Sequence, residues 1–361
     1  MYVDRPAERE LKRQSADPVV PGDHGVDFRA AVALSDLGQI LHSHLSDQRF
    51  CTTPDPARPP LQVPAEYPTI QQAIDAAEPG DIVSVGPGTY HEHLVLRTGV
   101  RLVGAGAWRT TLDGAGQAIS LIDYTGARDA LVSGFTLRGA GPAQGCAQPG
   151  DPFLCSGNWY AAAIYGDGHS QFETACGDSS VVITQNVFRD NYIAVMAYFH
   201  ARAVVRNNVF ASNEFGFVAN HLQDHALIMN NTFIDNRRLA VGSSAAYLDI
   251  FGNIIAGSAV AITHEFIQTG RIACNAFIAN GMVGERVPIG RDGNITADQA
   301  FVSPGTGDYR PAPQLIDALS ACLVDPAPGI DDPPPVIDWL RPEPGAFGGA
   351  LGLWSASPPK P

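Results

Sequence analysis

One short pattern recurs five times between residues 180 and 280, and it restricts the chain to a repeating architecture. The segments ITQNVFRDN, VRNNVFASN, IMNNTFIDN, IFGNIIAGS and IACNAFIAN align with steps of 22, 23, 22 and 22 residues. Three columns keep one register: a first polar column, an apolar column two positions later and a second polar column five positions later. Their members are Asn186, Asn208, Asn231, Asn253 and Asn275; Phe188, Phe210, Phe233, Ile255 and Phe277; and Asn191, Asn213, Asn236, Ser258 and Asn280.

The period indicates the kind of repeat. About 22 residues are too few for two helices, whereas short β-branched and aromatic runs suit one coil of a parallel β-helix. Each strand would pair in parallel with its equivalent one coil on, about 4.8 Å away, so that identical columns stack. The Asn column is predicted at a tight bend, where a short amide tolerates the left-handed backbone conformation and bonds neighbouring backbone groups. We interpret all three columns as structural.

Composition excludes several classes of function. The formal net charge is −14 and no basic run is present, which argues against a nucleic-acid partner. No apolar run is long enough to span a bilayer, and the N-terminus MYVDRPAERELKRQ lacks the apolar core of a signal peptide. The only lysines are Lys12 and Lys360, so no lysine in the coils can serve as a base.

The chain divides into an N-terminal extension over residues 1–60, a β-helix over 61–350 and a tail over 351–361. One docked helix is predicted in the extension from an apolar stripe at Phe28, Val32, Leu37, Ile40, Leu41 and Leu45. A second short helix, with Thr69 as N-cap and Gln72 completing a capping box, is predicted to cover the open first coil. Its apolar face comprises Ile70, Ala73, Ile74 and Ala77.

A loop insertion at about 140–178 is predicted to interrupt the coils and overhang one face. Cys146 and Cys155 bracket the segment GCAQPGDPFLCSG, which favours a local disulfide bond in an oxidising compartment. The aromatic residues Trp159 and Tyr160 add ligand-binding candidates on this insertion. Cys274 lies inside a coil, where we expect a buried free thiol.

Polar side chains on successive coils mark the candidate site. Aligning AIYGDGH, AVMAYFH, GFVANHL, AVGSS and AITHE stacks a column of Asp167, Tyr198, Asn220, Ser244 and Glu265. His169 and His200 form a second column, with His221 and His264 one position away. A stripe of titratable groups beside a loop is a candidate catalytic or binding site. The catalytic candidates are Asp167, His169, Tyr198, His200, His264 and Glu265, and the ligand-binding candidates are Trp159, Tyr160, Arg202, Asn220 and His221.

The run YPTIQQAIDAAEPGDIVSVGPGTYHEHLVL, followed by VRLVGAG, TTLDG and SGFTLRGA, resembles the opening of the pectin lyase-like superfamily of right-handed parallel β-helix proteins. The Asn-marked coils are similar to its β-helix repeat members, and the resemblance spans roughly residues 61–349. It implies an all-β right-handed parallel β-helix in an extracellular or periplasmic protein. The sequence contains no complete motif of a characterised activity of this superfamily. Gly168-His169 matches only part of the GHG element of pectin hydrolases, and His264-Glu265 matches only the last two residues of the DPHE element of alginate epimerases.

These observations favour a protein that binds and processes a polysaccharide by lyase-type or epimerase-type proton transfer, with His200 and Tyr198 as the central pair. Glycoside hydrolysis needs two nearby carboxylates, whereas Asp167 and Glu265 stand four coils apart, about 19 Å. A non-catalytic β-helix that binds glycan or protein at the cell surface is the alternative. Copper-linked periplasmic β-helix repeat proteins give a third, metal-handling hypothesis. No cofactor is required by the sequence; Ca²⁺ or a transition metal are the candidates. The oligomeric state stays open.

Overall fold

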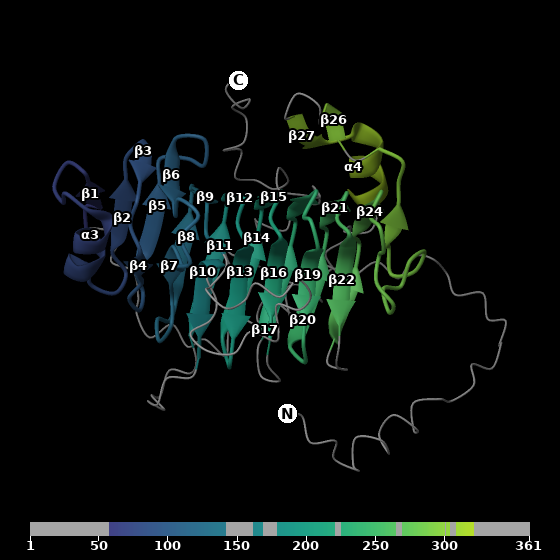
Figure 1. Cartoon of the computed structure of the whole chain (residues 1–361), viewed down its shortest axis with the longest axis horizontal. Helices are drawn as coiled ribbons and strands as arrows, with labels where there is room; N and C mark the ends of the chain where they lie inside the picture. Colours follow the sequence, from purple (N-terminus) through teal and green to yellow (C-terminus); the bar gives the residue numbers. More distant parts are fainter. Residues whose placement is uncertain are drawn as a thin grey trace, which may run out of the picture.

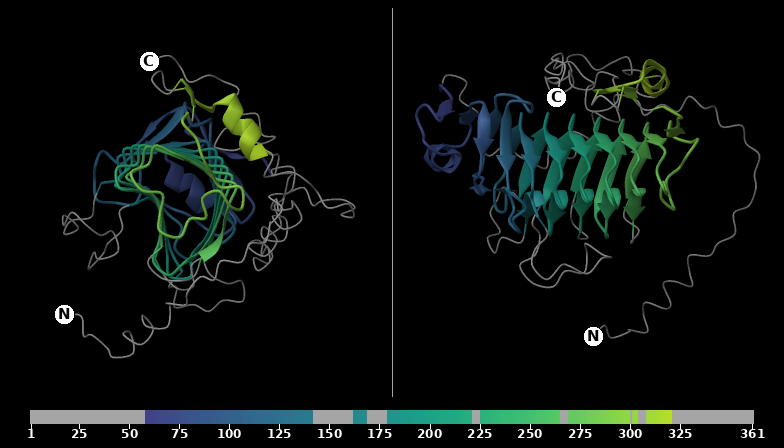
Figure 2. Two further views of the ribbon diagram at one scale, coloured as in Figure 1. Left: turned by 90° about the vertical axis from the view of Figure 1, so that its right-hand side faces the viewer. Right: turned by 45° about the horizontal axis from the view of Figure 1, so that its top comes forward.

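The structure is a computed structural model that describes residues 58–141, 162–168, 179–220, 225–264, 269–299, 301–303 and 308–320. In these ranges the chain winds into a parallel β-helix whose coils follow one another along the long axis (Figure 1). Each coil contributes one strand to sheet A, the next to sheet B and the third to sheet C, and the three sheets enclose a common interior (Figure 2). The predicted all-β right-handed parallel β-helix is confirmed.

The strands of each sheet are paired in parallel with those of adjacent coils. Sheet A contains β1 (Leu61–Val63), β2 (Ile82–Val85), β5 (Arg101–Gly104), β8 (Ala130–Ser133), β11 (Ser180–Thr184), β14 (Arg202–Arg206), β17 (His225–Met229), β20 (Tyr247–Phe251) and β23 (Thr269–Ala273). Sheet B contains β3 (Gly88–Tyr90), β6 (Thr110–Asp113), β9 (Thr136–Arg138), β12 (Val187–Arg189), β15 (Val209–Ala211), β18 (Thr232–Ile234), β21 (Ile254–Ala256), β24 (Ala276–Ile278) and β25 (Ile295–Thr296). Sheet C contains β4 (Leu94–Val95), β7 (Ile122–Asp123), β10 (Ala162–Asp167), β13 (Ile193–Tyr198), β16 (Phe215–Ala219), β19 (Leu239–Ser243) and β22 (Val260–His264).

Two ladders of buried asparagines join the coils at the A–B and B–C corners. In the first, Asn208 Oδ1 accepts the backbone N–H of Asn186 at 3.0 Å and its side-chain Nδ2 at 3.2 Å, while Asn208 Nδ2 donates to Asn231 Oδ1 at 3.0 Å. The pattern continues through Asn253 and Asn275. Because every amide is satisfied by its neighbours, the ladder can lie in the interior without a desolvation penalty.

The left-handed residue of each corner precedes the ladder residue, which corrects the expectation that the ladder Asn itself adopts this conformation. Positive φ angles occur at Gln185 (57°), Asn207 (54°), Asn230 (51°), Gly252 (63°) and Cys274 (59°), each one position before a ladder Asn. The left-handed residue makes the turn between the sheets, and the next side chain is thereby free to stack inside. At two of these corners the left-handed residue is also an asparagine, Asn207 or Asn230. Of each adjacent pair, the first Asn therefore turns the chain and the second stacks in the ladder.

The apolar column forms the predicted internal ladder. The rings of Phe188 and Phe210 stack with centroids 4.7 Å apart and those of Phe210 and Phe233 with centroids 4.5 Å apart. Ile255 and Phe277 continue the column in register. These side chains are buried, and we expect their burial to provide much of the stability of the coils.

Helix α3 (Ile70–Ala76) lies at the N-terminal end of the coils and crosses the interior when the molecule is viewed along its axis (Figure 2). Thr69 is its N-cap, and Thr69 Oγ1 accepts the backbone N–H of Gln72 at 3.2 Å. The Glu92 carboxylate accepts the backbone N–H groups of Ile70 and Gln71, an N-terminal contact that sequence reasoning did not anticipate. Ile70, Ala73 and Ile74 are buried, as their spacing predicts.

The coils are followed by an antiparallel pair, β26 (Phe301–Ser303) and β27 (Asp308–Pro311), and by helix α4 (Pro313–Ser320). Leu315 and Leu319 of α4 are buried in one cluster with Val209, Ile254 and other outward-facing residues of sheet B. This helix therefore covers part of sheet B (Figure 1). None of the helices that the structure describes is long and apolar enough to cross a membrane.

Two expectations need correction. The insertion predicted over 140–178 is not a single interruption, because it contains β10, a sheet C strand that pairs with β7 and β13. Cys274 is buried but not a free thiol, since it is disulfide-bonded. Cys146 and Cys155, the predicted helix over residues 28–45 and the tail over 351–361 lie outside the described residues.

The first ladder can be tested by N208A. This change leaves the buried N–H of Asn186 without its acceptor and removes the donor to Asn231. Because an unsatisfied buried group costs about 1–3 kcal/mol, we expect the free energy of unfolding to fall by roughly 3 kcal/mol in denaturant titration. N220A, at a partly exposed Asn outside both ladders, should change it by less than about 0.5 kcal/mol.

The second ladder offers the reciprocal test, because Ser258 interrupts it and its buried Oγ has no hydrogen-bond partner among the residues that the structure describes. S258N would complete the column between Asn236 and Asn280, and we expect it to raise the free energy of unfolding by about 1 kcal/mol. S258A should be close to neutral. A destabilising S258N would contradict the idea that the ladder geometry is open to Asn at this coil.

Candidate functional site

The predicted polar column exists at the end of sheet C. Asp167, the last residue of β10, is paired with Tyr198, the last residue of β13. The register continues one residue beyond the next strands, where the backbone N–H of Asn220 donates to Ala197 O and that of Ser244 donates to Ala219 O. All four residues are partly exposed. We call Asp167, Tyr198, Asn220 and Ser244 the sheet C column; at the spacing of parallel strands it is about 14 Å long.

Asp167 is held by residues on both sides of it along the chain. Its backbone N–H donates to Thr125 Oγ1 at 3.1 Å, and its carbonyl accepts Ser179 Oγ at 2.9 Å. The hydroxyl of Tyr165, on the same face of β10, lies 3.4 Å from Asp167 Oδ2. The carboxylate is therefore positioned by its neighbours rather than carried on a free loop.

A strained turn formed by Phe199 and His200 follows Tyr198. Phe199 (φ 42°) and His200 (φ 61°) both adopt the left-handed region, which is costly for bulky side chains and recurs at functional sites. The ring of Phe199 lies edge-on to that of Tyr198, with centroids 4.5 Å apart. Below this turn the backbone N–H of Gly168 donates to Tyr198 O. A Cβ on Gly168 would lie 2.2 Å from Phe199 O, so the Gly168-His169 dipeptide has a steric reason to contain glycine.

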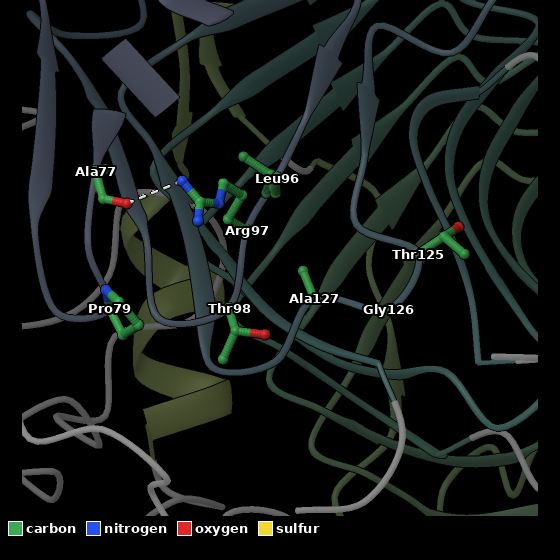
Figure 3. A pocket seen from close by; sticks show the side chains of 8 residues that line it. All are labelled: Ala77, Pro79, Leu96, Arg97, Thr98, Thr125, Gly126 and Ala127. Atoms are coloured by element: carbon green, nitrogen blue, oxygen red, sulfur yellow. Dashed lines mark hydrogen bonds between the residues drawn. The ribbon is translucent and has the colours of Figure 1, made fainter. Parts of the chain in front are cut away.

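A pocket of about 360 Å³ is lined by Thr125 and seven neighbouring residues (Figure 3). It adjoins the column because Thr125 Oγ1 accepts the backbone N–H of Asp167. It lies between the turns that follow β4 and β7 and the end of helix α3, and its polar side chains are Arg97, Thr98 and Thr125. Arg97 donates to the carbonyl oxygens of Asp75 (2.5 Å) and Ala77 (3.2 Å) and stays exposed. Val95 pairs with Asp123 and Asp123 with Tyr165, so Arg97 and Thr125, two residues further on, extend the sheet C column toward the N-terminus.

Sequence reasoning missed Arg97 and Thr125, because their coils precede the Asn-marked repeats from which the alignment was built. Alternation of side-chain direction beyond LVL and LIDY would have placed these two residues on the face of the column. It can be followed only once the short strands β4 and β7 have been located.

The remaining candidates are distributed differently. Arg202 is the first residue of β14 in sheet A and pairs with His225, so it stands round the corner from the column. His264 ends β22 and pairs with Ser243, one position before the column. Four arginines that could have gathered to bind an acidic polymer do not: Arg138 and Arg189 pair in sheet B, and Arg202 and Arg206 belong to sheet A. Trp159, Tyr160, His169, His221 and Glu265 lie outside the described residues.

The column presents a carboxylate, a phenol, an amide and a hydroxyl, with an imidazole close by in sequence. Such groups form hydrogen bonds to a hydroxyl-rich ligand, and Tyr198 and His200 are side chains that can exchange protons. In the described ranges the column holds one carboxylate, which does not provide the pair that glycoside hydrolysis requires. The described part of the chain also contains no group of three or more His, Cys, Asp or Glu residues placed to hold a metal ion.

Comparisons with known proteins give one family match. Residues 174–287 match the family described as "Periplasmic copper-binding protein (NosD)", a stretch that contains the Asn-marked coils. The metal centre that this description implies is not formed by the residues the structure describes. A comparison with curated proteins gives no significant match.

Solved structures of low sequence identity are also similar to this chain. Pectin methylesterase PemA from Erwinia chrysanthemi is 14% identical, with a TM-score of 0.33, over 78% of this chain and 100% of that chain. The A-module of the mannuronan C-5 epimerase AlgE6 from Azotobacter vinelandii is 15% identical, with a TM-score of 0.27, over 64% of this chain and 89% of that chain. The three parallel sheets described above make this chain a right-handed parallel β-helix protein.

The strain at His200 can be measured through stability. H200G removes the cost of a left-handed non-glycine residue, so we expect a gain of about 1 kcal/mol in the free energy of unfolding. S212G, at a left-handed corner remote from the column, should gain a similar amount. A loss of stability in H200G alone would show that the imidazole is retained as a structural contact.

Proposed function

We propose that this protein binds an extended polysaccharide along the sheet C column and processes it by proton transfer at Tyr198 and His200. The observation that carries the proposal is the register that places Asp167, Tyr198, Asn220 and Ser244 on four successive coils. Their spacing of about 4.8 Å is close to the length of one sugar unit in an extended chain. A linear polymer lying parallel to the axis would therefore meet one polar side chain for each unit.

The polymer we favour contains uronic acid units. Arg97 is an exposed cation at the pocket end of the column and would bind the carboxylate of a unit bound there. Arg202, round the corner from Tyr198, is the candidate cation for the reacting unit. The many hydroxyl groups of the polymer would bond to Asp167, Asn220 and Ser244, because these side chains combine acceptors and donors.

The chemistry assigned to the centre is removal of the proton next to the uronate carboxyl. His200 would accept this proton as general base. In a lyase-type reaction the electron pair forms a C=C bond as the glycosidic C–O bond breaks, and Tyr198 protonates the leaving oxygen. In an epimerase-type reaction Tyr198 instead returns a proton to the opposite face of the same carbon. Neither reaction needs the second carboxylate that hydrolysis requires.

An extracytoplasmic location fits this proposal. The matching family is described as periplasmic, and Cys274 is disulfide-bonded, as expected of a protein that folds in an oxidising compartment.

The decisive comparison is between Y198F and the unchanged protein on a panel of uronic acid and neutral polysaccharides. Unsaturated ends are followed by absorbance, new reducing ends by colorimetry and epimerisation by deuterium uptake from solvent. We expect Y198F to lose at least about 10²-fold in turnover with an unchanged unfolding midpoint, because it removes only a proton-transferring hydroxyl. Y247F, at an exposed tyrosine of sheet A, is the matched control and should retain full activity.

If the protein produces neither unsaturated ends nor reducing ends and causes no deuterium uptake on any polysaccharide, the proposed catalysis is contradicted. The non-catalytic alternative then predicts that oligosaccharide affinity persists and falls when Asn220 or Arg97 is replaced by Ala. Reducing ends without unsaturated products would instead mean hydrolysis by groups outside the column.

A second candidate, copper handling, is favoured by the family match over residues 174–287. Any such centre must use residues beyond those the structure describes, since these contain no group of three candidate ligands. Equilibrium dialysis against Cu²⁺ and Cu⁺ distinguishes it from the leading proposal. Retained stoichiometric copper that is lost in H200A and H221A, together with inactivity on every polysaccharide, would favour this candidate.

A further inference from the structure

Two exposed histidines stand two positions apart at the B–C corner of an early coil. His91 and His93 lie in the segment 91–93, which connects β3 of sheet B to β4 of sheet C. The sheet C column lies at the other end of the sheet C strands, where these strands end. Neither histidine lies in the stretch 174–287 that matches the family model. The functions considered above therefore give these two side chains no role.

Both imidazoles are held by hydrogen bonds to the next coil. Nδ1 of His91 lies 3.0 Å from the carbonyl oxygen of Asp113, and Nδ1 of His93 bonds to the carbonyl oxygen of Ser120. Because a carbonyl oxygen can only accept a hydrogen bond, Nδ1 carries the proton in each ring. In the neutral imidazole the lone pair then lies on Nε2. The backbone thus selects the same tautomer at both positions.

The two Nε2 atoms are open to a ligand. Both histidines are exposed, and their Nδ1 atoms make the only hydrogen bonds that either imidazole forms with the residues the structure describes. Histidines that ligate a metal usually donate the other ring N–H to a backbone carbonyl or a carboxylate. This contact orients the ring and makes the ligating nitrogen more basic. His91 and His93 both have this support.

The two imidazoles lie on the same side of the chain. Glu92, between them, points toward helix α3, because its carboxylate accepts the backbone N–H groups of Ile70 and Gln71 at 3.0 and 3.1 Å. The histidines bond to the following coil instead, as expected for alternation along an extended segment. Residues two apart in such a segment are separated by about 6.6 Å. Two imidazoles can close this separation on one ion, since each forms a metal bond of about 2.0–2.1 Å.

The neighbouring carboxylates are engaged elsewhere. Asp113 Oδ2 accepts Nε and an Nη of Arg138, each at 2.8 Å, and the Glu92 carboxylate caps helix α3. The pair therefore supplies two ligands and leaves the other positions to water, which agrees with the lack of a group of three candidate ligands among the described residues. Imidazole nitrogen suits Zn²⁺, Cu²⁺ and Ni²⁺, whereas Ca²⁺ and Mg²⁺ prefer oxygen.

We propose that His91 and His93 form an open binding site for a divalent transition metal ion, which both ligate through Nε2. The carbonyl oxygens of Asp113 and Ser120 orient the two rings before the ion binds. The site does not depend on the polysaccharide proposal, because it lies at the B–C corner and the sheet C column at the C–A corner.

Zn²⁺ titration of the full chain, labelled with ¹⁵N at histidine, tests the proposal. Long-range ¹H–¹⁵N spectra show which ring nitrogen carries the proton and which one binds the metal. Without Zn²⁺ we expect the Nδ1–H tautomer at His91 and His93. With Zn²⁺ the Nε2 signals of both rings should move together while Nδ1 keeps its proton.

Asparagine variants provide the matched comparison. The side-chain amide of Asn can still donate to the carbonyl oxygen of the next coil but offers no ligating nitrogen. We expect H91N and H93N each to lower the affinity for Zn²⁺ at least about tenfold in calorimetry, because loss of even a supporting contact costs about 10–100-fold. The unfolding midpoint should not change. H42A/H44A removes the other His-x-His segment and should leave the affinity of this site unchanged.

Three results would overturn the assignment: an Nε2–H tautomer in either ring without Zn²⁺, movement of only one Nε2 signal, or unchanged affinity in H91N and H93N. If an Asn variant lowers the unfolding midpoint, H91Q and H93Q replace it and must show the same loss of affinity. H200A and H221A should leave the Zn²⁺ response of His91 and His93 intact, which separates this site from the copper centre considered above.

Discussion

Hydrogen bonding between buried asparagine side chains is the interaction on which the rest of this structure depends. Each ladder Asn satisfies the backbone N–H and the amide of its equivalent in the preceding coil, so neighbouring coils are locked in one register. A slip of one residue would leave several buried polar groups without partners, at about 1–3 kcal/mol each. The aromatic ladder follows this register, and so does every outward-facing side chain.

The candidate site develops at the corner that lacks a ladder. The A–B and B–C corners of the central coils are one left-handed residue followed by Asn or Ser, whereas the connections from sheet C to sheet A vary from three residues after β13 and β19 to twelve after β10. Variation is tolerated there because no side-chain ladder has to be maintained. The sheet C column, the strained Phe199-His200 turn and the pocket beside Thr125 all occupy this corner, where a rigid register meets adaptable loops.

The outer faces of sheets C and A share one pattern. Sheet C ends in partly exposed polar groups at one per coil, next to buried outward-facing residues such as Met196 and Val218. Sheet A likewise buries Leu227 and Phe251 in the middle and at the end of its strands, whereas Tyr247 at a strand start is exposed. A parallel β-helix can support many functions, so the side chains of the site, and not the fold, distinguish the two proposed functions.

The sequence by itself determined the coil. The 22-residue spacing from Asn186 to Asn275 predicts the parallel strands and the Phe ladder, because a fixed period permits one stacking register. The alignment of AIYGDGH with AVMAYFH predicts the pairing of Asp167 with Tyr198. Thr69 and Gln72 likewise place helix α3 through local capping. Tertiary structure alone decided which of two adjacent asparagines turns the chain and that Arg97 and Thr125 extend the column. These features depend on contacts between coils that lack the repeated motif. Such contacts produce no repeated pattern that could be recognised in the sequence. The same reason hid the burial of Leu227 and Phe251, since alternation predicts which side chains face outward but not what lies over them.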